Sequence, residues 1–270
     1  MTENLMGKPT EYPDSYSPDI LLAISRIDNR KLLGLDTKLP FIGKDIWNAY
    51  ELSWLNKQGL PQVALARFHF ACESPNLIES KSLKLYLNSL NQESYENEEQ
   101  LQALLIKDLS EKCGADVKVE LLGLEDKAHI IEVPGGNCLD KLEISVEHYH
   151  PAAELLSVDD GRQVQEQLYS NLFRSNCPIT NQPDWATISI AYSGSAISHE
   201  SLLAYLISYR LHNDYHENCV EKIFVDIQAR CKPTELTVRA NFLRRGGLDI
   251  NPVRSSTGIE NTVLSRLVRQ

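Results

Sequence analysis

Two residues in the second half of the 270-residue chain have the types needed for covalent catalysis. Cys177 lies in a polar loop, and a carboxylate, Asp184, follows seven residues later. Nucleophilic attack by a thiol needs the thiolate form and a nearby group that manages the proton, which a desolvated aspartate could do. A buried, inert thiol beside a turn aspartate explains the same spacing, so the spacing alone leaves both interpretations open.

A second candidate is the dipeptide His216-Glu217, at the start of a predicted helix. A carboxylate there can accept two N–H donors from a guanine-like edge, and an adjacent imidazole can relay protons. The alternative is that Glu217 only complements the helix N-terminus while His216 is solvated.

Two further segments have the composition of a phosphate site. Residues 79–86 place a carboxylate and two lysines at a predicted helix start, and residues 244–252 place two arginines before a glycine pair. A capped amphipathic helix and a glycine turn with surface arginines are the simpler alternatives. The sequence contains no glycine-rich dinucleotide loop, P-loop or G-x-S-x-G motif, so a nicotinamide cofactor would not be held by a Rossmann fold.

The periodicity of apolar residues predicts the elements that carry these segments. Alternation predicts strands at 63–70, 117–122, 142–146, 186–192 and 236–242. Helical spacing predicts helices at 82–90, 101–109, 202–207 and 220–227, and Ser198 is a plausible N-cap of the third.

The order strand, helix, helix, strand occurs twice, and Glu96-Asn97 matches Glu217-Asn218 at an offset of 121 residues. This repetition predicts an α+β fold of two tandem modules, each an antiparallel sheet covered by a helix pair. We expect an irregular N-terminal arm over residues 1–45, a first module over 46–155 and a second over 156–270, with the junction near 151–161.

Composition limits the classes of protein. The net charge of −10 and the isoelectric point of about 5.2 argue against a general nucleic-acid binder, which needs a basic surface. Residues 1–16 lack the apolar core of a signal peptide, and no apolar run is long enough to span a bilayer. Six cysteines without a C-x-x-C pair suit a reducing compartment, so we expect a cytosolic protein without disulfides.

Taken together and in this order, the four segments resemble the NADPH-dependent 7-cyano-7-deazaguanine reductases of the queuosine pathway. The resemblance is to the long, two-module form and extends over residues 19–270. Its most telling segments are 76–82, 175–177, 182–185, 216–217 and 244–252.

The resemblance implies two tandem tunnelling-fold modules, a barrel assembled across subunits, and a homodimer. It implies that Cys177 attacks the nitrile carbon to form a thioimide, that Asp184 donates the proton, and that His216 is placed for proton relay. It further implies substrate binding by Ile78, Glu79, Ser80, His216 and Glu217, and NADPH binding by Ser80, Lys81, Arg245 and Gly246. No metal and no direct nucleic-acid partner are expected.

Two positions depart from the family pattern. Val253 stands where tryptophan usually follows the proline, and Tyr215 stands where phenylalanine is common.

Two other functions stay open at this point. One is a metal-dependent pterin or purine enzyme of the same fold, with Cys177 and His216 as ligands. The other is a nucleobase-binding module without catalysis.

Overall fold

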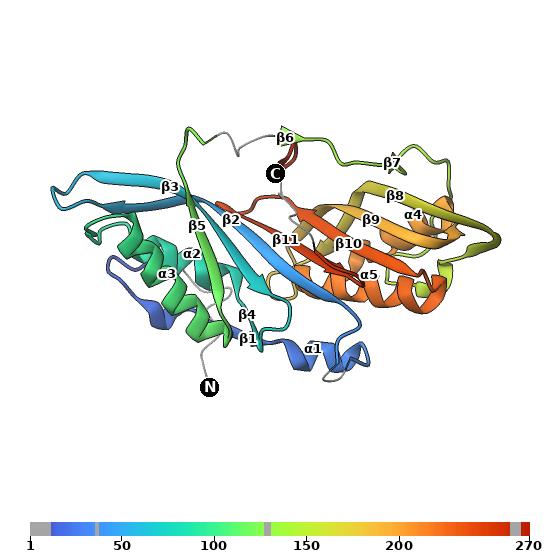
Figure 1. The fold of residues 1–270 in the computed structure, drawn as a ribbon, viewed down its shortest axis with the longest axis horizontal. Helices are drawn as coiled ribbons and strands as arrows, with labels where there is room; N and C mark the ends of the chain where they lie inside the picture. The colour runs from blue at the N-terminus through green and yellow to red at the C-terminus, as the bar shows by residue number, and fades with distance from the viewer. Residues whose placement is uncertain (1–11, 36–37, 127–130, 260–265) are drawn as a thin grey trace. The chain divides into compact units, whose positions relative to one another are not determined.

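The computed structural model describes residues 12–35, 38–126, 131–259 and 266–270 of the chain. It has a mixed α+β structure in which most strand pairs are antiparallel (Figure 1). The chain divides into two compact units. The first consists of Met1–Leu32, Lys44–His129 and Arg244–Ile250, and the second of Leu33–Gly43, Ile130–Leu243 and Asn251–Gln270. Within the described residues, no helix is both long and apolar enough to cross a membrane.

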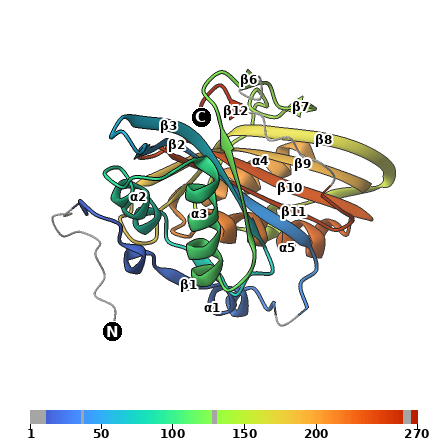
Figure 2. The ribbon, with the colours of Figure 1, turned by 60° about the vertical axis from the view of Figure 1, so that its left-hand side comes forward.

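In the first unit, helices pack on one face of a sheet whose strand order is β5-β3-β2-β11 (Figures 1 and 2). Its elements are η1 (Pro18–Ile20), β1 (Ala23–Ser25), α1 (Arg26–Leu32), most of β2 (Ile42–Leu55), β3 (Pro61–Ala71), β4 (Asn76–Ile78), α2 (Ser80–Ser89), α3 (Glu98–Cys113), β5 (Val117–Leu122) and the first residues of β11 (Leu248–Ser255).

The core of the first unit follows from period-two and helical spacing of apolar residues. Phe68 and Phe70 alternate along β3, and Leu101, Leu105 and Leu109 recur along α3; all five are buried in one cluster. A helix with one apolar stripe gains most of its stability by burying that stripe, so α3 is fixed against the sheet.

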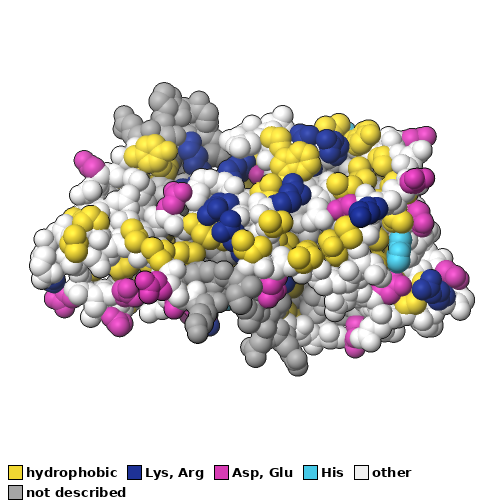
Figure 3. Space-filling view, turned by 90° about the horizontal axis from the view of Figure 1, so that it is seen from above, with side chains coloured by type: hydrophobic (Ala, Val, Ile, Leu, Met, Phe, Trp, Pro, Cys, Tyr) yellow, Lys and Arg dark blue, Asp and Glu magenta, His cyan; other side chains and the backbone are white. Residues whose placement is uncertain are grey.

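In the second unit, α4 and α5 cover one face of the strands β11-β10-β9-β8-β7 (Figures 1 and 2). Its elements are β6 (Ile131–Glu132), β7 (Asn137–Cys138), η2 (Ala153–Leu155), β8 (Val158–Asn176), β9 (Pro183–Ile197), α4 (His199–Ile207), η3 (Ser208–Leu211), α5 (His216–Cys231), β10 (Glu235–Phe242), the rest of β11, and β12 (Arg266–Leu267). Seen from above, its other side shows Lys and Arg side chains among apolar ones (right half of Figure 3).

Most of the predicted elements are present. The predicted helices correspond to α2, α3, α4 and α5, and four predicted strands correspond to β3, β5, β9 and β10. Ser198 is the N-cap of α4, since its hydroxyl oxygen accepts a hydrogen bond from the Ser201 backbone N–H at 3.2 Å. The resulting α+β class agrees with the sequence analysis.

The strand predicted at 142–146 is wrong, because residues 141–150 contain no strand. Leu142, Ile144 and Val146 alternate as half-buried residues with exposed neighbours, but no strand is formed by this segment. The described part of residues 1–45 is also more regular than expected, since it contains β1, α1 and the start of β2. Alternation of apolar residues did not predict the long strands β2, β8 and β11 or the short strands β1, β4, β6, β7 and β12.

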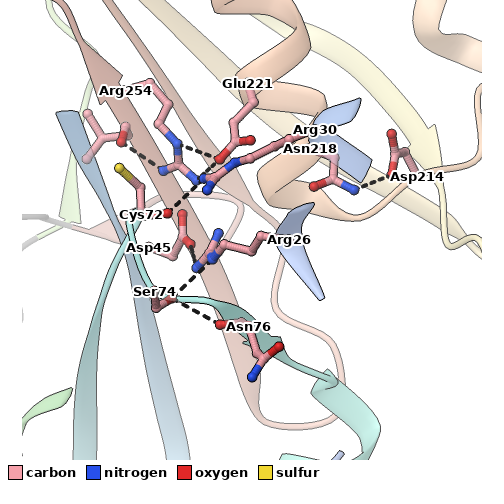
Figure 4. Close-up of polar contacts among 11 residues, drawn as sticks. Arg26, Arg30, Asp45, Cys72, Ser74, Asn76, Asp214, Asn218, Glu221 and Arg254 are labelled. Carbon is pink, nitrogen blue, oxygen red and sulfur yellow. Dashed lines mark hydrogen bonds and ion pairs between the residues drawn. The ribbon is translucent and has the colours of Figure 1, made fainter. Parts of the chain in front are cut away.

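Buried ion pairs fix individual elements within each unit (Figure 4). In the first unit, Arg26 on α1 donates from Nη2 to Oδ2 of Asp45 at 2.6 Å and from Nε to Oγ of Ser74 at 3.1 Å. In the second unit, Arg254 on β11 donates from Nε and Nη2 to Oε1 of Glu221 on α5, at 3.1 and 2.8 Å. Both arginines are almost fully buried, so each needs its carboxylate partner.

The first testable prediction concerns the Arg26–Asp45 pair. Asp45→Leu removes the carboxylate and leaves a buried guanidinium with a hydroxyl, which should lower the free energy of unfolding by about 3–5 kcal/mol. Urea unfolding followed by tryptophan fluorescence measures it. The double variant Arg26→Met/Asp45→Leu, which removes both charges, should recover most of the loss. A loss below about 1 kcal/mol in the single variant, as for an exposed pair, would contradict this account.

Candidate active site

Cys177 lies at the end of a hairpin, directly after β8, and is 8% exposed. Its backbone N–H donates to the Gln182 carbonyl oxygen at 2.9 Å, and its own carbonyl oxygen accepts from the Asn181 N–H at 3.0 Å. Asn181 has a φ of 55°, a left-handed conformation that asparagine tolerates better than most residues. The tight turn therefore presents the thiol at a fixed point on the unit.

The same hairpin carries Asp184 near the start of its second strand. On β9, Asp184 pairs with Ser175 of β8, two residues before the cysteine. The Asp184 side chain is 7% exposed, and its Oδ2 lies 3.4 Å from Nε2 of His216. A carboxylate and an imidazole at this separation can exchange a proton with little movement.

The first turn of α5 carries His216 and Glu217. Tyr215 is the N-cap residue, and Oδ1 of Asp214 accepts from the Tyr215 N–H at 2.7 Å and from Nδ2 of Asn218 at 2.8 Å (the latter in Figure 4). The Glu217 side chain is buried, with 3% exposure. A carboxylate in the first turn of a helix is stabilised by the helix dipole, which reduces the cost of that burial.

Backbone hydrogen bonds join the cysteine hairpin to the segment that precedes α5. The Asn176 N–H donates to the His212 carbonyl oxygen at 2.8 Å, and the Asp214 N–H donates back to the Asn176 carbonyl oxygen at 3.0 Å. Nδ2 of Asn213 also donates to the Cys177 carbonyl oxygen at 3.4 Å. Cys177, Asp184 and the His216-Glu217 dipeptide, far apart in the sequence, therefore converge in one corner of the second unit.

The predicted substrate residues of the first unit surround the start of α2. Ile78 pairs with Ala23 across the β1–β4 ladder and is buried. Glu79 is the N-cap of α2, and its carboxylate accepts from the backbone N–H groups of Lys81 at 2.9 Å and Ser82 at 2.7 Å. Each carboxylate oxygen has a further acceptor position, so capping leaves room for a ligand donor.

A cavity of about 510 Å³ in the first unit is lined by Lys84 and by both glycines of the pair Gly246-Gly247. Lys84 packs on this turn so closely that a Cβ at Gly246 would lie 3.1 Å from the Lys84 Cδ. Lys81 precedes Lys84 by three residues and therefore projects from the same helix face. The carboxylate of Glu51 also lines the cavity, so its field is mixed rather than purely basic.

The glycine turn holds the two predicted arginine positions. The Arg245 N–H donates to the Leu248 carbonyl oxygen at 2.8 Å, and the guanidinium of Arg244 lies 4.3 Å from the Tyr50 ring centroid. Gly247 has a φ of +77°, and a Cβ there would lie 2.7 Å from the Glu51 carboxylate carbon. Only glycine fits this position. Arg245 and Gly246 belong to the first unit, although the predicted module boundary assigned them to the second.

Phe242 and Asn213 lie near the site without having been predicted as site residues, and Lys84 was predicted only as the second lysine of residues 79–86. Phe242 packs its ring 4.0 Å from the His216 ring, centroid to centroid. Helical spacing from Lys81 could have assigned Lys84. The contacts of Phe242 and Asn213 depend on tertiary structure and leave no local signal.

Within the part of the chain that the structure describes, no group of three or more His, Cys, Asp or Glu side chains is arranged to hold a metal ion. Cys177 and His216 therefore have no third ligand of these types among those residues, and the metal-dependent alternative gains no support from the geometry.

Comparison with known proteins identifies the class first. A family model described as "Nitrile reductase, 7-cyano-7-deazaguanine-reductase N-term" matches residues 12–121, and a model described as "QueF-like protein" matches residues 183–261. A solved structure titled as the archaeosine synthase QueF-Like in the apo form matches 36% of this chain at 22% identity, with a TM-score of 0.32.

Full-length relatives then specify the family. A protein of Saccharophagus degradans is 51% identical over 254 residues, which is 94% of each chain, and one of Desulfotalea psychrophila is 49% identical over the whole of both chains. A relative from Bordetella avium is 49% identical over 98% of this chain. All three are named NADPH-dependent 7-cyano-7-deazaguanine reductase. The chain belongs to this reductase family.

The second prediction concerns the thiols that are not assigned to catalysis. Burial raises the pKa of Cys231 to about 11, and burial followed by the Asp214 carboxylate raises the pKa of Cys219 well above its ordinary value. Iodoacetamide at about pH 8 should therefore modify the exposed Cys138 in the native protein and spare both buried thiols, because the thiolate is the reactive form.

Peptide mass spectrometry measures the modification at each cysteine. Protein unfolded in urea is the control, in which all these thiols should react at similar rates. Alkylation of native Cys219 as fast as Cys138 would show that the thiol is not buried.

Proposed function

We propose that the chain reduces the nitrile of 7-cyano-7-deazaguanine to an aminomethyl group with NADPH, through a thioimide on Cys177. The near full-length similarity to reductases of that name supports the substrate and the cofactor. The observation that carries the residue assignment is the convergence of the Cys177 hairpin with the Asp184–His216 pair.

The first step is nucleophilic addition. A nitrile is a poor hydride acceptor, so the Cys177 thiolate adds to its carbon, a C–S bond forms, and one π bond of the triple bond breaks. The nitrile nitrogen takes a proton from Asp184, which is buried on the same hairpin as the cysteine and lies 3.4 Å from His216. The proton that leaves the Cys177 thiol passes to His216, which returns it to Asp184, so the thiol proton replaces the one given to the nitrogen. The product is a thioimide, whose C=N bond accepts hydride more readily.

Conversion of a nitrile to an amine takes up four electrons, so two NADPH are consumed, each supplying one hydride. After the first reduction the C–S bond breaks, the thiolate leaves, and an imine remains to be reduced. Water would hydrolyse that imine, so the site must be closed to solvent. The low exposure of Cys177, Asp184 and Glu217 suits this requirement.

Glu217 is proposed to recognise the deazaguanine by accepting two N–H donors with one carboxylate. Ile78, Glu79 and Ser80 are proposed as further substrate-binding residues, and His216 as one that also contacts the base. The buried position of Glu217 excludes competing water, which makes each ligand hydrogen bond stronger than it would be at the surface.

NADPH is proposed to use Ser80, Lys81, Lys84, Arg245 and Gly246. Lys81 and Lys84 can supply positive charge for its phosphates, because they project from one face of α2 and Lys84 packs on the glycine turn. The first backbone N–H groups of α2 already donate to the Glu79 carboxylate, so the lysines rather than the helix N-terminus would hold the charge. The lysine-lined cavity of about 510 Å³ lies along the same helix. The extra phosphate that distinguishes NADPH from NADH adds charge for such a clamp to bind.

Three finer properties complete the proposal. Two tandem tunnelling-fold modules are proposed, over about residues 46–155 and 156–270, although Arg244–Ile250 cluster with the first compact unit and Ile130 onward with the second. A homodimer would let neighbouring modules close their sheets into a barrel. The cytosol is the proposed location, where the six thiols would stay reduced.

The third prediction tests the nucleophile. Cys177→Ala should lower NADPH oxidation with 7-cyano-7-deazaguanine by about a thousandfold or more, because the nitrile loses its only covalent activation. The native protein mixed with the nitrile alone should develop the absorbance band of a thioimide, and the variant should not. Cys138→Ala, which changes an exposed cysteine, is the matched control and should keep full activity.

Turnover retained by Cys177→Ala would contradict the covalent mechanism. Binding of the base without any NADPH oxidation by the native protein would instead support the nucleobase-binding alternative.

The fourth prediction tests the phosphate clamp. Lys84→Met should raise the KM for NADPH by about tenfold with a smaller change in kcat, since one charge-assisted hydrogen bond to a phosphate is lost. Steady-state kinetics at saturating nitrile measures both constants. Lys57→Met is the control, because Lys57 belongs to the same unit but pairs with the exposed Glu96. An unchanged KM for NADPH in Lys84→Met would remove Lys84 from the cofactor site.

A further inference from the structure

The side-chain amide of Gln270 is buried, and each of its hydrogen-bonding positions is used. Its nitrogen Nε2 donates to the Phe242 carbonyl oxygen at 3.0 Å and to Oδ1 of Asn251 at 2.7 Å. Its oxygen Oε1 accepts from the Leu267 N–H at 3.0 Å and from Nδ2 of Asn241 at 3.1 Å. A primary amide has two donors and two acceptor positions, and these four hydrogen bonds use all of them.

The network lies directly behind the aromatic contact to His216. Phe242 is the last residue of β10, and its ring lies 4.0 Å from the His216 ring at an interplanar angle of 50°. The next residue, Leu243, donates its N–H to the Trp185 carbonyl oxygen at 2.9 Å, and Trp185 directly follows Asp184. The end of β10 therefore contacts both members of the Asp184–His216 pair or their immediate neighbours.

A buried carbonyl group that loses its donor destabilises the conformation that buries it. Without the Gln270 amide, the Phe242 carbonyl oxygen would lose the donor that holds it at the end of the strand. The Phe242 ring would then be free to shift, and His216 would lose the flat surface that sets its orientation. The loss of orientation would act on proton transfer rather than on the phosphate clamp, whose residues lie in the first unit.

We infer that Gln270 is a positioning residue for the reaction: its amide fixes the end of β10 so that Phe242 holds His216 against Asp184. The inference rests on the proposed role of His216. It adds a residue that touches neither substrate nor cofactor and acts through the Phe242 ring.

A double-mutant cycle tests this. Gln270→Met keeps the length of the side chain and removes the amide, and kcat should fall by about tenfold, as for a small misplacement of a catalytic group. The KM for NADPH should stay within about twofold. In a His216→Ala background, Gln270→Met should cause no further loss beyond about twofold, because the residue through which it acts is already absent.

Arg269→Met is the matched control. It removes another hydrogen bond of the same segment, from Nη1 to the Asn171 carbonyl oxygen at 2.7 Å, and should leave kcat unchanged. If Gln270→Met does not fold, judged from its thermal midpoint, Gln270→Glu replaces it in the cycle. The carboxylate keeps both accepted hydrogen bonds and loses both donations, to the Phe242 carbonyl oxygen and to Oδ1 of Asn251.

An equal loss of kcat in both backgrounds, or no loss in the native background, would overturn the inference. Full activity of His216→Ala would instead reject the proposed role of His216. The two failures are therefore distinguishable.

Discussion

The arrangement of the second unit depends on one buried ion pair, between Arg254 of β11 and Glu221 of α5. The guanidinium is fully buried, with Nε and Nη2 on Glu221 and Nη1 on the Val253 carbonyl oxygen at 2.9 Å. Gly43 permits this packing, since a Cβ there would collide with the Val253 carbonyl and lie 2.7 Å from Cδ of Arg254. Because such a pair tolerates little displacement, it fixes the rotation of α5 about its axis.

That rotation determines what the first turn of α5 can do. Glu221 and Glu217 are four residues apart, so they lie on one face of the helix, and a constraint on Glu221 also directs Glu217 inward. Both carboxylates are nearly inaccessible to solvent. The cysteine is positioned differently, by backbone hydrogen bonds of the 177–182 turn and of Asn176. The candidate site thus combines groups from one face of α5 and from the end of the β8–β9 hairpin. Each of these elements is held in place by its own contacts.

Local sequence patterns predicted the elements that pack by periodicity and missed those that do not. α2, α3, α4 and α5 each bury an apolar stripe, and that stripe is visible in the sequence. β11 is buried along its whole length and contains Pro252, so it shows no alternation, and the first half of β8 is polar and exposed. The segment 142–146 alternates without a pairing strand, and periodicity cannot report a partner.

The same limit applies to the candidate site. Cys177, Asp184, His216 and Glu217 could be proposed because their residue types and order resemble those of a family, whereas spacing alone left each of them ambiguous. Gln270 and Phe242 act through contacts with residues far away in the sequence, and nothing local distinguishes them from ordinary core residues. Residue types and their order therefore identify candidate catalytic residues more readily than the residues that position them.

The dipeptides Glu96-Asn97 and Glu217-Asn218 lie at different positions relative to the start of their helices. This difference leaves one glutamate at the surface and places the other in the interior. Asn97 is the N-cap of α3, so Glu96 precedes that helix, is exposed, and pairs with Lys57 at 3.0 Å. In the second unit Tyr215 is the N-cap of α5, so the helix starts three residues earlier relative to the dipeptide, and Glu217 falls in its first turn. There the helix dipole favours the carboxylate, and the turn directs it into the interior. The buried carboxylate of the second unit thus results from a helix that begins nearly one turn earlier, not from a different residue type. At the corresponding position of the first unit, the same residue type is exposed.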